Sequence, residues 1–346
     1  MRTLISFPGT RHNAFPRMLY SALPSETWTI RSPRKLWALN RLLGQAADGD
    51  VLHMQWAWPF LSAAESSTQV ADRMQTFREH LEPALGRGVR LVWHVHNILS
   101  HDSCFSEREW ELNAMLAETA HAVVQLNTAT SEQLSEQVAL DRGKVVTIRH
   151  SSYLGEYPSS VTQRAARQAL GIEQRETCVG FVGQIRPYKG IETLLDAYEN
   201  QEGSPRWKLL VAGQLHEGTG GDIRARLDKA EAVTQFEFVR DDELQLWFRA
   251  ADVLVFPYRE VLNSGSAYLS ATFGRPAVLP DVPQFEEIFA GREWVSLCAP
   301  TGDGVSEAVS QLLVSWEQRC RSARIFAEEH PPRRMAEEFR AVLEAL

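Results

Sequence analysis

Short apolar runs alternate with amphipathic stretches along the chain, and the alternation occurs twice. In the first half, runs with the length of buried strands lie at Thr3–Phe7, Asp50–Met54, Arg90–His94, Ala122–Leu126 and Val145–Ile148. Helical spacing of apolar residues predicts helices over Val70–Leu85 and Glu107–Ala120. Apolar strands separated by helices are typical of a parallel sheet that is covered on both faces.

The pattern restarts after Tyr153–Thr162, a segment with the Gly, Pro and Ser content of a linker. The strands predicted in the second half are Thr177–Val182, Lys208–Ala212, Phe236–Val239, Val253–Pro257, Ala277–Leu279 and Val295–Leu297. The helices predicted between them are Ile191–Glu199, Ile223–Ala232, Asp242–Ala250 and Ser264–Phe273. This order predicts an α/β protein with two doubly wound, Rossmann-like domains.

We place the first domain at residues 1–152, a linker at 153–170 and the second domain at 171–328. A charged helix over 329–346 is expected to pack back on the first domain. In open parallel sheets, ligands bind at the carboxyl ends of the strands. We therefore expect the chemistry in the loops that follow the strands, with the two domains facing across a cleft.

Composition narrows the class of protein. Of the 346 residues, 44% are hydrophobic and 23% are charged, as in globular proteins. The four cysteines are far apart, which argues against a zinc site or a disulfide framework and favours a cytoplasmic protein. No run of about 18 apolar residues exists to span a membrane, and the formal net charge of −8 argues against a nucleic-acid partner.

Positive charge is concentrated near the N-terminus. Between Arg11 and Arg41 there are six basic residues and one acidic residue, Glu26. The stretch from Ser32 to Leu43 has helical spacing, with Trp37 among the cations. Two interpretations stay open: an interfacial contact with an anionic membrane, or a core-facing helix whose basic face is solvated.

Two loops in the second half have the chemistry of anion sites. Residues Gly183 to Gly190 join a strand to a helix and include Gln184, Arg186 and Lys189. A helix N-terminus favours anions, and the two cations add charge-assisted hydrogen bonds to a diphosphate. After the strand that ends near Pro257, the chain runs through Tyr258, Asn263, Ser264, Gly265 and Ser266 into a helix. Asn263 or Ser264 caps that helix, and Gly265 lets a ligand approach its backbone.

The first half offers candidate bases. His94, His96, His101 and Asp102 lie within nine residues at the end of one predicted strand. Histidine and aspartate at such a position are candidates for proton transfer. A metal site is the competing idea, but no further ligand has convincing spacing, so we expect no metal. His94 is a candidate for a buried structural role instead.

Three segments of the second half, Phe181–Gly190, Ala251–Arg259 and Leu262–Ser266, resemble bacterial GT-B glycosyltransferases. Among these enzymes, the segments are most similar to those of the β-mannosyltransferases of xanthan-type exopolysaccharide assembly. In the first half, the same pattern is matched by Asp50–Trp56, by His96 and Asn97 with His101 and Asp102, and by Arg149–Tyr153. The resemblance covers nearly the whole chain.

The resemblance implies that the second domain holds a nucleotide-sugar and the first domain holds the acceptor. The implied donor residues are Gly183, Gln184, Arg186, Lys189, Tyr258, Asn263, Ser264, Gly265, Ser266 and Glu287. The implied acceptor residues are Gly9, Thr10, Asn13, Trp56, Asn97 and His150. Lys189 would contact the donor diphosphate, and Arg186 replaces the Arg that the family commonly has at position 184.

One departure bears on stereochemistry. Many retaining GT-B enzymes have two glutamates that would fall at positions 261 and 269, where this chain has Val261 and Leu269. This difference favours an inverting reaction, with Asp102, His96 or His101 as the base. No metal is expected, because Arg186, Lys189 and the helix at Ser264 would stabilise the departing diphosphate. Asp102 has an alternative role as a helix cap, and Glu287 has one as an acid at a helix start.

The expected partners are a nucleotide-sugar, GDP-mannose or a UDP-sugar, and a saccharide acceptor that is free or lipid-linked. No cofactor is expected, because the nucleotide-sugar is a co-substrate. The expected location is the cytoplasm or the inner face of its membrane. Two alternatives remain: a non-hydrolysing nucleotide-sugar epimerase, and a non-catalytic module that binds nucleotide-sugars.

Overall fold

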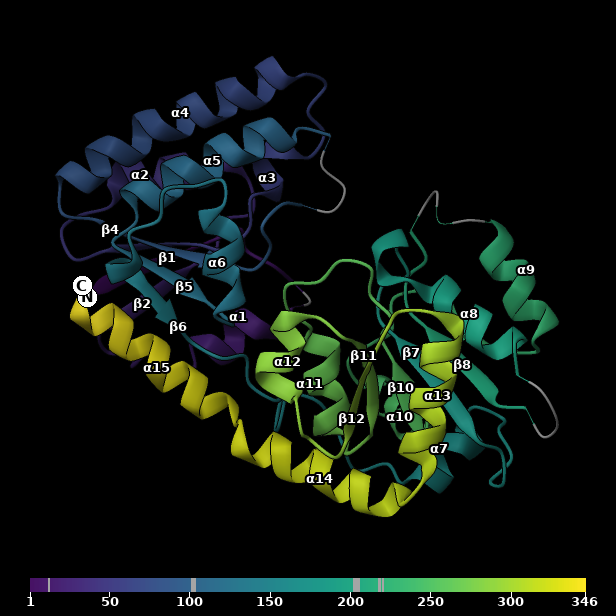
Figure 1. The fold of residues 1–346 in the computed structure, drawn as a ribbon. Helices are drawn as coiled ribbons and strands as arrows, with labels where there is room; N and C mark the ends of the chain where they lie inside the picture. The colour runs from purple at the N-terminus through teal and green to yellow at the C-terminus, as the bar shows by residue number, and fades with distance from the viewer. Residues whose placement is uncertain (12, 101–103, 202–205, 217–218, 220) are drawn as a thin grey trace. The chain divides into compact units, whose positions relative to one another are not determined.

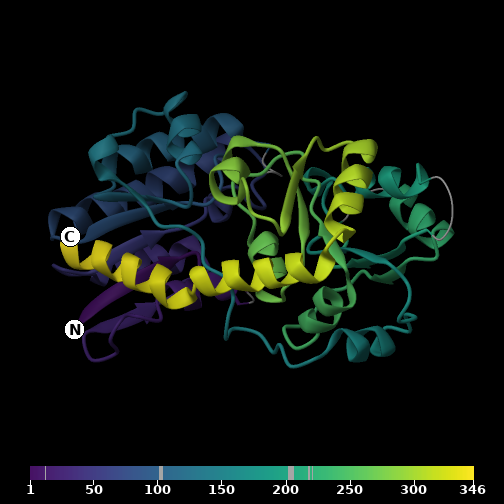
Figure 2. The same ribbon diagram turned by 60° about the horizontal axis from the view of Figure 1, so that its bottom comes forward.

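The computed structural model describes residues 1–11, 13–100, 104–201, 206–216, 219 and 221–346 (Figure 1). These residues form two compact units. Unit 1 comprises Met1–Arg149 with Arg333–Leu346, and unit 2 comprises His150–Pro332. The chain returns from unit 2 to unit 1 through its last two helices, α14 and α15 (Figure 2). None of the described helices combines the length and the hydropathy that crossing a bilayer requires.

Unit 1 is built on a six-stranded parallel sheet with the strand order β2-β1-β3-β4-β5-β6. Its strands are β1 (Arg2–Phe7), β2 (Trp28–Arg31), β3 (Val51–Met54), β4 (Arg90–Val95), β5 (Ala122–Gln125) and β6 (Val145–Thr147). Its helices are α1 (Ala14–Leu19), α2 (Leu36–Gln45), α3 (Trp58–Leu61), α4 (Ser67–Gly86), α5 (Ser106–Thr119), α6 (Ala129–Ser135) and α15 (Pro332–Ala345), with a 3-10 turn η1 (Arg142–Lys144). Helices α4 and α5 lie on one side of the sheet and α15 on the other (Figure 1).

Unit 2 has a second six-stranded parallel sheet, with the order β12-β11-β10-β7-β8-β9. Its strands are β7 (Cys178–Val182), β8 (Lys208–Ala212), β9 (Val233–Gln235), β10 (Val253–Val255), β11 (Ala277–Pro280) and β12 (Val295–Cys298). Its helices are α7 (Gln163–Ala169), α8 (Ile191–Glu199), α9 (Gly221–Lys229), α10 (Leu244–Ala250), α11 (Gly265–Thr272), α12 (Pro283–Phe289), α13 (Gly302–Leu313) and α14 (Trp316–Glu329), with a 3-10 turn η2 (Pro187–Lys189).

The central strands are buried on both faces. Every residue of β3, β7, β10 and β11 is buried, because helices cover both sides of each sheet. The predicted α/β class with two doubly wound sheets is confirmed, and all strands except β2 and β9 match the predicted apolar runs within a few residues. The apolar pattern that predicted them is the pattern that a covered parallel sheet requires.

The structure differs from the prediction at two strands. The strand predicted at Phe236–Val239 is wrong: β9 lies earlier, at Val233–Gln235, and Phe238 is 48% exposed. The edge strand β2 was not predicted, because only Trp28 of its four residues is buried and the alternation is too short to detect. Both strands lie at the edge of a sheet, where burial constrains the sequence least.

Candidate active site

Strand order places together, in unit 2, the two loops that the sequence predicts to bind the donor, which are called the donor loops below. Read from β9 to β12, the sheet runs outward in both directions from β7 and β10, so the order reverses between these two strands. Ligands of doubly wound sheets bind at this switch point, beyond the carboxyl ends of the strands. The loop with Lys189 follows β7, and the loop with Tyr258 and Ser264 follows β10.

Two glycines shape the loop after β7. Gly183 has φ +151°, and Gly190 has φ +65° at the start of α8, a left-handed conformation that favours glycine. A Cβ on Gly190 would overlap the carbonyl oxygen of Pro257. The close approach is reinforced by the Arg259 amide, which donates to the Tyr188 carbonyl at 2.9 Å. The glycines therefore bring the two donor loops into backbone contact.

Lys189 and the start of α11 are joined through one tyrosine. The Lys189 Nζ lies 4.0 Å from the centre of the Tyr258 ring, a cation–π contact worth about 0.5–2 kcal/mol. The Tyr258 hydroxyl lies 3.0 Å from the Ser264 hydroxyl. Ser264 is the N-cap of α11, and its Oγ accepts from the Ala267 amide at 3.3 Å. A cation and a helix N-terminus thus lie at the same end of the sheet.

Gly265 lies against two residues from the start of unit 2. A Cβ on Gly265 would be 2.6 Å from the Tyr153 hydroxyl and 3.8 Å from His150 Nε2. The His150 ring stacks on Tyr268 with ring centres 4.7 Å apart, and burial lowers its pKa to about 4. His150, predicted among the acceptor residues, lies in unit 2 beside the start of α11.

The remaining predicted donor residues lie around these loops. Gln184 is exposed and Arg186 is half-buried at the start of η2. Ser266 follows Gly265, and its hydroxyl is 3.5 Å from where a Cβ on Gly183 would lie. Glu287 lies in α12, which is tied to the loop after β10 because Gln284 Nε2 donates to the Val261 carbonyl at 3.1 Å. Asn263 precedes the cap residue and is half-buried.

In unit 1 the strand register gathers histidines on one face of the sheet. Ser6 pairs with His53, and His53 pairs with Val92 in the parallel register. Because alternate residues of a strand share a face, His94 lies on the same face as His53, with ring centres 5.5 Å apart. The polar members of this face are at the carboxyl ends of β1, β3 and β4.

Aromatic stacking continues beyond His94. The rings of His94 and His96 are nearly parallel with centres 4.3 Å apart, and His96 stacks on Trp56 at the same distance. The Phe15 ring meets both imidazoles edge-on, at 5.4 and 5.0 Å. His96 is 7% exposed, so the predicted base lies within a packed aromatic column.

A buried hydrogen-bond network underlies this column. The Tyr20 hydroxyl lies 2.7 Å from His53 Nδ1 and 2.8 Å from Ser6 Oγ. Gln55 Nε2 donates to Ser6 Oγ at 2.9 Å and to the Tyr20 hydroxyl at 3.1 Å. Burial, with the neighbouring His94, holds the pKa of His53 well below its usual value. His53 was not predicted as a site residue. The sequence signal that could have indicated it is the presence of a histidine inside an otherwise apolar predicted strand.

The loop after His96 is held by α5. Glu109 is 3% exposed, and its Oε1 accepts from the Ser100 amide at 2.8 Å and the Ser100 hydroxyl at 2.6 Å. One turn later, Asn113 Nδ2 donates to the Ile98 carbonyl at 2.8 Å. The predicted bases His101 and Asp102 lie outside the described residues.

Other predicted acceptor residues have local structural contacts. Asn13 caps α1, and its Oδ1 accepts from the Phe15 amide at 2.9 Å. The Gly9 amide donates to the Pro33 carbonyl at 2.7 Å, and a Cβ on Gly9 would overlap the Ser32 carbonyl. Thr10 is exposed and Asn97 is half-buried. Among the described residues, no group of three His, Cys, Asp or Glu side chains is arranged to hold a metal ion.

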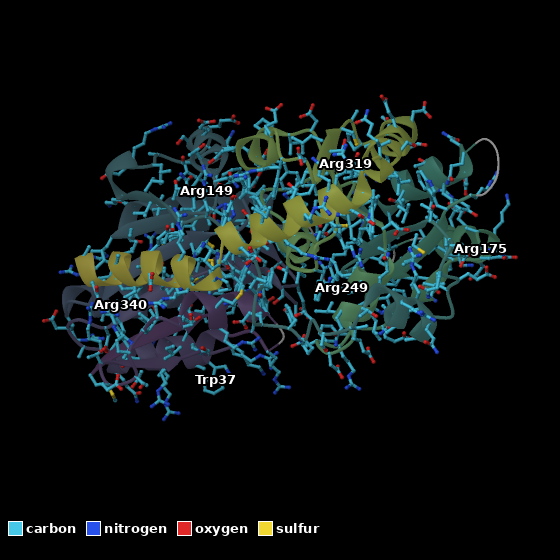
Figure 3. The ribbon with its side chains drawn as sticks, turned by 90° about the horizontal axis from the view of Figure 1, so that it is seen from below. Trp37, Arg149, Arg175, Arg249, Arg319 and Arg340 are labelled. Atoms are coloured by element: carbon cyan, nitrogen blue, oxygen red, sulfur yellow. The ribbon has the colours of Figure 1, made fainter. Side chains whose placement is uncertain are left out.

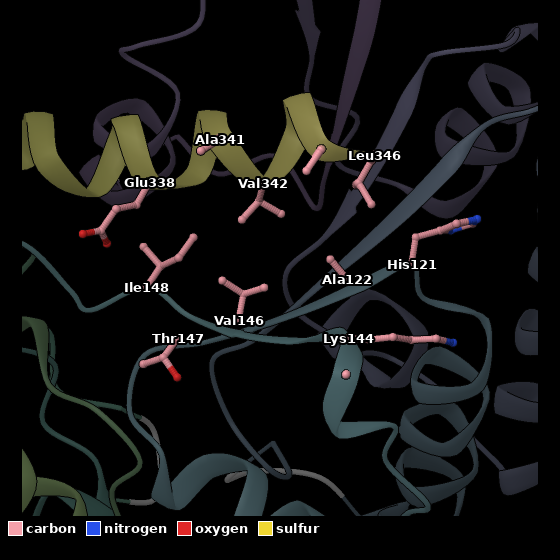
Figure 4. A pocket seen from close by; sticks show the side chains of 12 residues that line it. His121, Ala122, Lys144, Val146, Thr147, Ile148, Glu338, Ala341, Val342 and Leu346 are labelled. Carbon is pink, nitrogen blue, oxygen red and sulfur yellow. The ribbon is translucent and has the colours of Figure 1, made fainter.

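Unit 1 also contains a groove of about 450 Å³ between β6 and α15. Its walls include Val146, Ile148 and Val342. His121, which precedes β5, and Lys144, which ends η1, also line it (Figure 4). None of the predicted site residues lines this groove. The groove lies at the β6 edge of the sheet. The contacting rings of His53, His94, His96 and Trp56, called the histidine column below, lie at the ends of β3 and β4 in the interior of the sheet.

Comparison with known proteins matches residues 176–315 to the family described as glycosyl transferases group 1. The GDP-mannose:glycolipid 4-beta-D-mannosyltransferase of Xanthomonas campestris pv. campestris is 24% identical over 281 residues, which cover 79% of this chain and 71% of that protein. The lipopolysaccharide core biosynthesis mannosyltransferase LpsB of Rhizobium meliloti is 28% identical over 131 residues, 36% of this chain and 37% of that protein.

Solved structures share the fold over the full length. Anabaena Alr3699/HepE in complex with UDP-glucose superposes with a TM-score of 0.76 at 12% identity and covers 100% of both chains. WaaG, a glycosyltransferase involved in lipopolysaccharide biosynthesis, superposes with a TM-score of 0.68 at 13% identity and covers 98% of each chain. Identities this low compare folds only.

Proposed function

We propose that this chain, a group 1 glycosyltransferase with the GT-B fold, transfers a hexose, with mannose favoured, from a nucleotide-sugar to a saccharide or lipid-linked saccharide. The observation that supports this most directly is the contact of Lys189 with Tyr258, which joins the cation to the capped start of α11. A diphosphate placed between them would meet positive charge from both sides.

The donor end of the reaction needs stabilisation of a leaving diphosphate. Lys189 and Arg186 supply fixed charge, and the first amides of α11 supply hydrogen bonds. The Ser266 hydroxyl lies 3.5 Å from where a Cβ on Gly183 would lie, so the loop after β7 and the start of α11 are close enough to contact one diphosphate. These groups neutralise the departing charge without requiring a metal ion. Ser266, Asn263 and Glu287 are proposed to contact the sugar or ribose hydroxyls.

The acceptor end needs a base. In an inverting transfer, the acceptor hydroxyl loses its proton as its oxygen attacks the anomeric carbon opposite the diphosphate. We assign this role to Asp102, with His96 or His101 next in order. Val261 and Leu269 occupy the positions of the retaining glutamates, and neither side chain can act as a base or nucleophile.

The donor is proposed to be GDP-mannose, because the Xanthomonas relative acts with GDP-mannose on a glycolipid. Alr3699/HepE is solved with UDP and glucose, so UDP-sugars are the second candidate. Trp56, which stacks on His96, is proposed to present its ring to an acceptor sugar.

A lipid-linked acceptor would require unit 1 to act at a membrane surface. Trp37 is 66% exposed and Ile30 is 42% exposed, and Trp37 lies at the lower edge of the view in Figure 3. The cations beside them, Arg31, Arg34, Lys35 and Arg41, are all exposed. We propose that this basic surface contacts the anionic inner face of the cytoplasmic membrane.

A transfer assay tests the proposal. The protein is incubated with radiolabelled GDP-mannose and a bacterial glycolipid extract, and label in the organic phase is measured. We expect transfer, release of the label by β-mannosidase, and a loss of about 100- to 1,000-fold in kcat/KM for Lys189→Ala. Lys229→Ala, an exposed lysine of α9, is the matched control and should leave transfer unchanged.

Two results would contradict the proposal. Conversion of the donor into a free isomeric nucleotide-sugar, with no labelled glycolipid, would favour the epimerase. Release of the label by α-mannosidase alone would establish retention of configuration and refute the inverting mechanism.

A further inference from the structure

Three arginines of unit 2 lie together at the edge of the sheet opposite the donor loops. Arg249 is in the last turn of α10, shortly before β10, and Arg275 lies shortly before β11, so both are near the amino ends of these strands. Arg324 comes from α14, and its Nε is 2.6 Å from where a Cβ on Gly274 would lie. Arg249 is labelled in Figure 3. This arginine cluster is therefore separate from the loops that follow β7 and β10.

Arg275 is a buried cation that forms no ion pair with any residue that the structure describes. Its side chain is 3% exposed, Nη2 donates to the Arg249 carbonyl at 2.7 Å, and Nη1 lies 4.0 Å from the Cys320 sulfur. Nε has no hydrogen-bond partner within the described part of the chain, and the same holds for the buried Nε of Arg249. Buried charges in proteins are normally paired, so this site has an unmet need for negative charge.

The neighbouring groups meet that need only in part. The centre of the Trp316 ring lies 5.2 Å from the Arg275 guanidinium carbon, but the ring carries no net charge. Asp252 already accepts from Arg167 at 2.7 Å and from the Cys178 amide at 2.8 Å. Burial raises the pKa of the Cys320 thiol, which keeps it neutral. The carboxyl end of α10 contributes about half an elementary charge, less than the charge of three guanidinium groups. Burial, together with Arg249, lowers the pKa of Arg275 to about 10.

We propose that Arg249, Arg275 and Arg324 form a binding site for a small soluble phosphate ion, distinct from the nucleotide-sugar site. A tetrahedral oxyanion matches the planar, multidentate guanidinium better than a halide does. Arg324 is exposed, Arg249 is half-buried and Arg275 is buried. This gradient gives the ion a path from solvent to the unpaired charge.

Thermal unfolding with inorganic phosphate tests the site, with sodium chloride at equal ionic strength as the reference. We expect phosphate to raise the melting temperature of unit 2 by about 2–4 °C more than chloride does. Arg324→Gln, at an exposed position, should reduce that difference to near zero. Arg275→Met should do the same while remaining folded, because an apolar side chain replaces an unpaired buried charge.

Two further variants locate the ion. Lys189→Ala should keep the phosphate effect, because the cluster lies away from the donor loops. Arg175→Gln, whose side chain is 86% exposed elsewhere in unit 2, should also keep it. A phosphate effect that Lys189→Ala abolishes and Arg324→Gln retains would place the ion at the donor loops and overturn the proposal.

The absence of any phosphate effect beyond that of chloride would also overturn it. Vesicles containing phosphatidylglycerol distinguish a soluble ion from a lipid headgroup. Vesicle binding that Arg324→Gln weakens, without any effect of inorganic phosphate, would assign the cluster to lipid instead. Rapid alkylation of Cys320 at pH 7, unaffected by phosphate, would show that a thiolate already balances Arg275.

Discussion

The switch point of unit 2 and the histidine column of unit 1 both lie at the carboxyl ends of parallel strands, yet they are built differently. In unit 2, Gly183, Lys189 and Gly190 belong to one loop and lie within eight residues of one another. In unit 1, His53 and Trp56 come from the end of β3, His94 and His96 come from the end of β4, and the two pairs meet through ring contacts. One site is a polar backbone cradle, and the other is a packed aromatic column.

Because they are built differently, the two sites are suited to different ligands. A phosphate needs amides, positive charge and room beside the backbone, which a glycine-containing loop supplies locally. A sugar acceptor needs a flat apolar surface and a base, which requires side chains from several strands. Damage to the unit 2 loops should therefore abolish donor binding, whereas damage to the unit 1 column should spare it.

The largest effect is expected from Asp102→Asn, which removes the proposed base. The turnover number should fall by about 100- to 10,000-fold, while the affinity for GDP stays within twofold of wild type. Steady-state kinetics and calorimetric titration with GDP measure the two quantities.

His96→Phe, within the histidine column, is the comparison for Asp102→Asn. Phenylalanine preserves the stacking between Trp56 and His94 but removes the ring nitrogens. Full activity of Asp102→Asn, combined with an inactive His96→Phe, would transfer the role of base to His96.

Low pH should reduce the folding stability of both units, and the size of the reduction can be calculated for unit 2. The pKa of His150 is about 4 when folded, below the unfolded value near 6.5. The unfolded chain therefore binds the proton first as the pH falls. Stability is complete above about pH 6.5 and declines toward pH 4, by about 2 kcal/mol at pH 5.

His150→Phe should remove this pH dependence while keeping the stack on Tyr268. Urea unfolding of unit 2 at pH 7 and pH 5 makes the measurement. An equal loss of stability in wild type and variant would show that other groups cause the acid sensitivity.

Glu109 sharpens the comparison by testing whether the unit 1 loop must be held in place. Glu109→Ala removes the acceptor for both Ser100 hydrogen bonds and should lower kcat about tenfold, at roughly 1.4 kcal/mol of lost positioning. The KM for the donor should not change. Glu109→Gln keeps an acceptor oxygen and should restore most of the activity.

Glu111→Ala provides the control on the same helix, because Glu111 is exposed and pairs only with Arg108 among the described residues. If Glu109→Ala and Glu109→Gln lose activity equally, the hydrogen-bond geometry is not the cause.

The smallest effect is expected at the basic surface of unit 1. Arg34→Gln should weaken binding to phosphatidylglycerol vesicles about fivefold, at about 1 kcal/mol for each cation near a charged surface. Its stability should not change, because Arg34 is exposed. Vesicle sedimentation measures the binding, with Arg175→Gln of unit 2 as the control. Equal binding by the two variants would argue against a membrane role for this surface.

The contrast between the two sites also explains what could be predicted from the sequence. The loops of unit 2 were predicted because glycine, lysine and a capping serine act on neighbouring residues. To predict that Lys189 and Ser264 bind a ligand, it was enough to recognise that each follows the end of a predicted strand. Their link through the Tyr258 ring needed the strand order, which local patterns do not specify.

The histidine column depends on contacts that are distant in sequence. His53 meets His94 because β3 pairs with β4 in one register. It also meets Phe339 of α15, with ring centres 4.7 Å apart, although nearly the whole chain separates them. The helix was predicted from its own spacing, but the partner of its apolar face was not encoded locally. Glu109 was missed for the same reason, since a buried acid resembles an exposed one until its partners are known.

The most direct test of the central claim is thermal unfolding of the wild type and Lys189→Ala in the presence of GDP, UDP and ADP. A nucleotide that binds only the folded protein must raise its melting temperature. We predict that GDP at about a hundred times its Kd raises the melting temperature of the wild type by roughly 5–10 °C and leaves Lys189→Ala unchanged. If no nucleotide stabilises the wild type at saturating concentration, the loops after β7 and β10 are not a donor site, and the proposed transfer from a nucleotide-sugar is wrong.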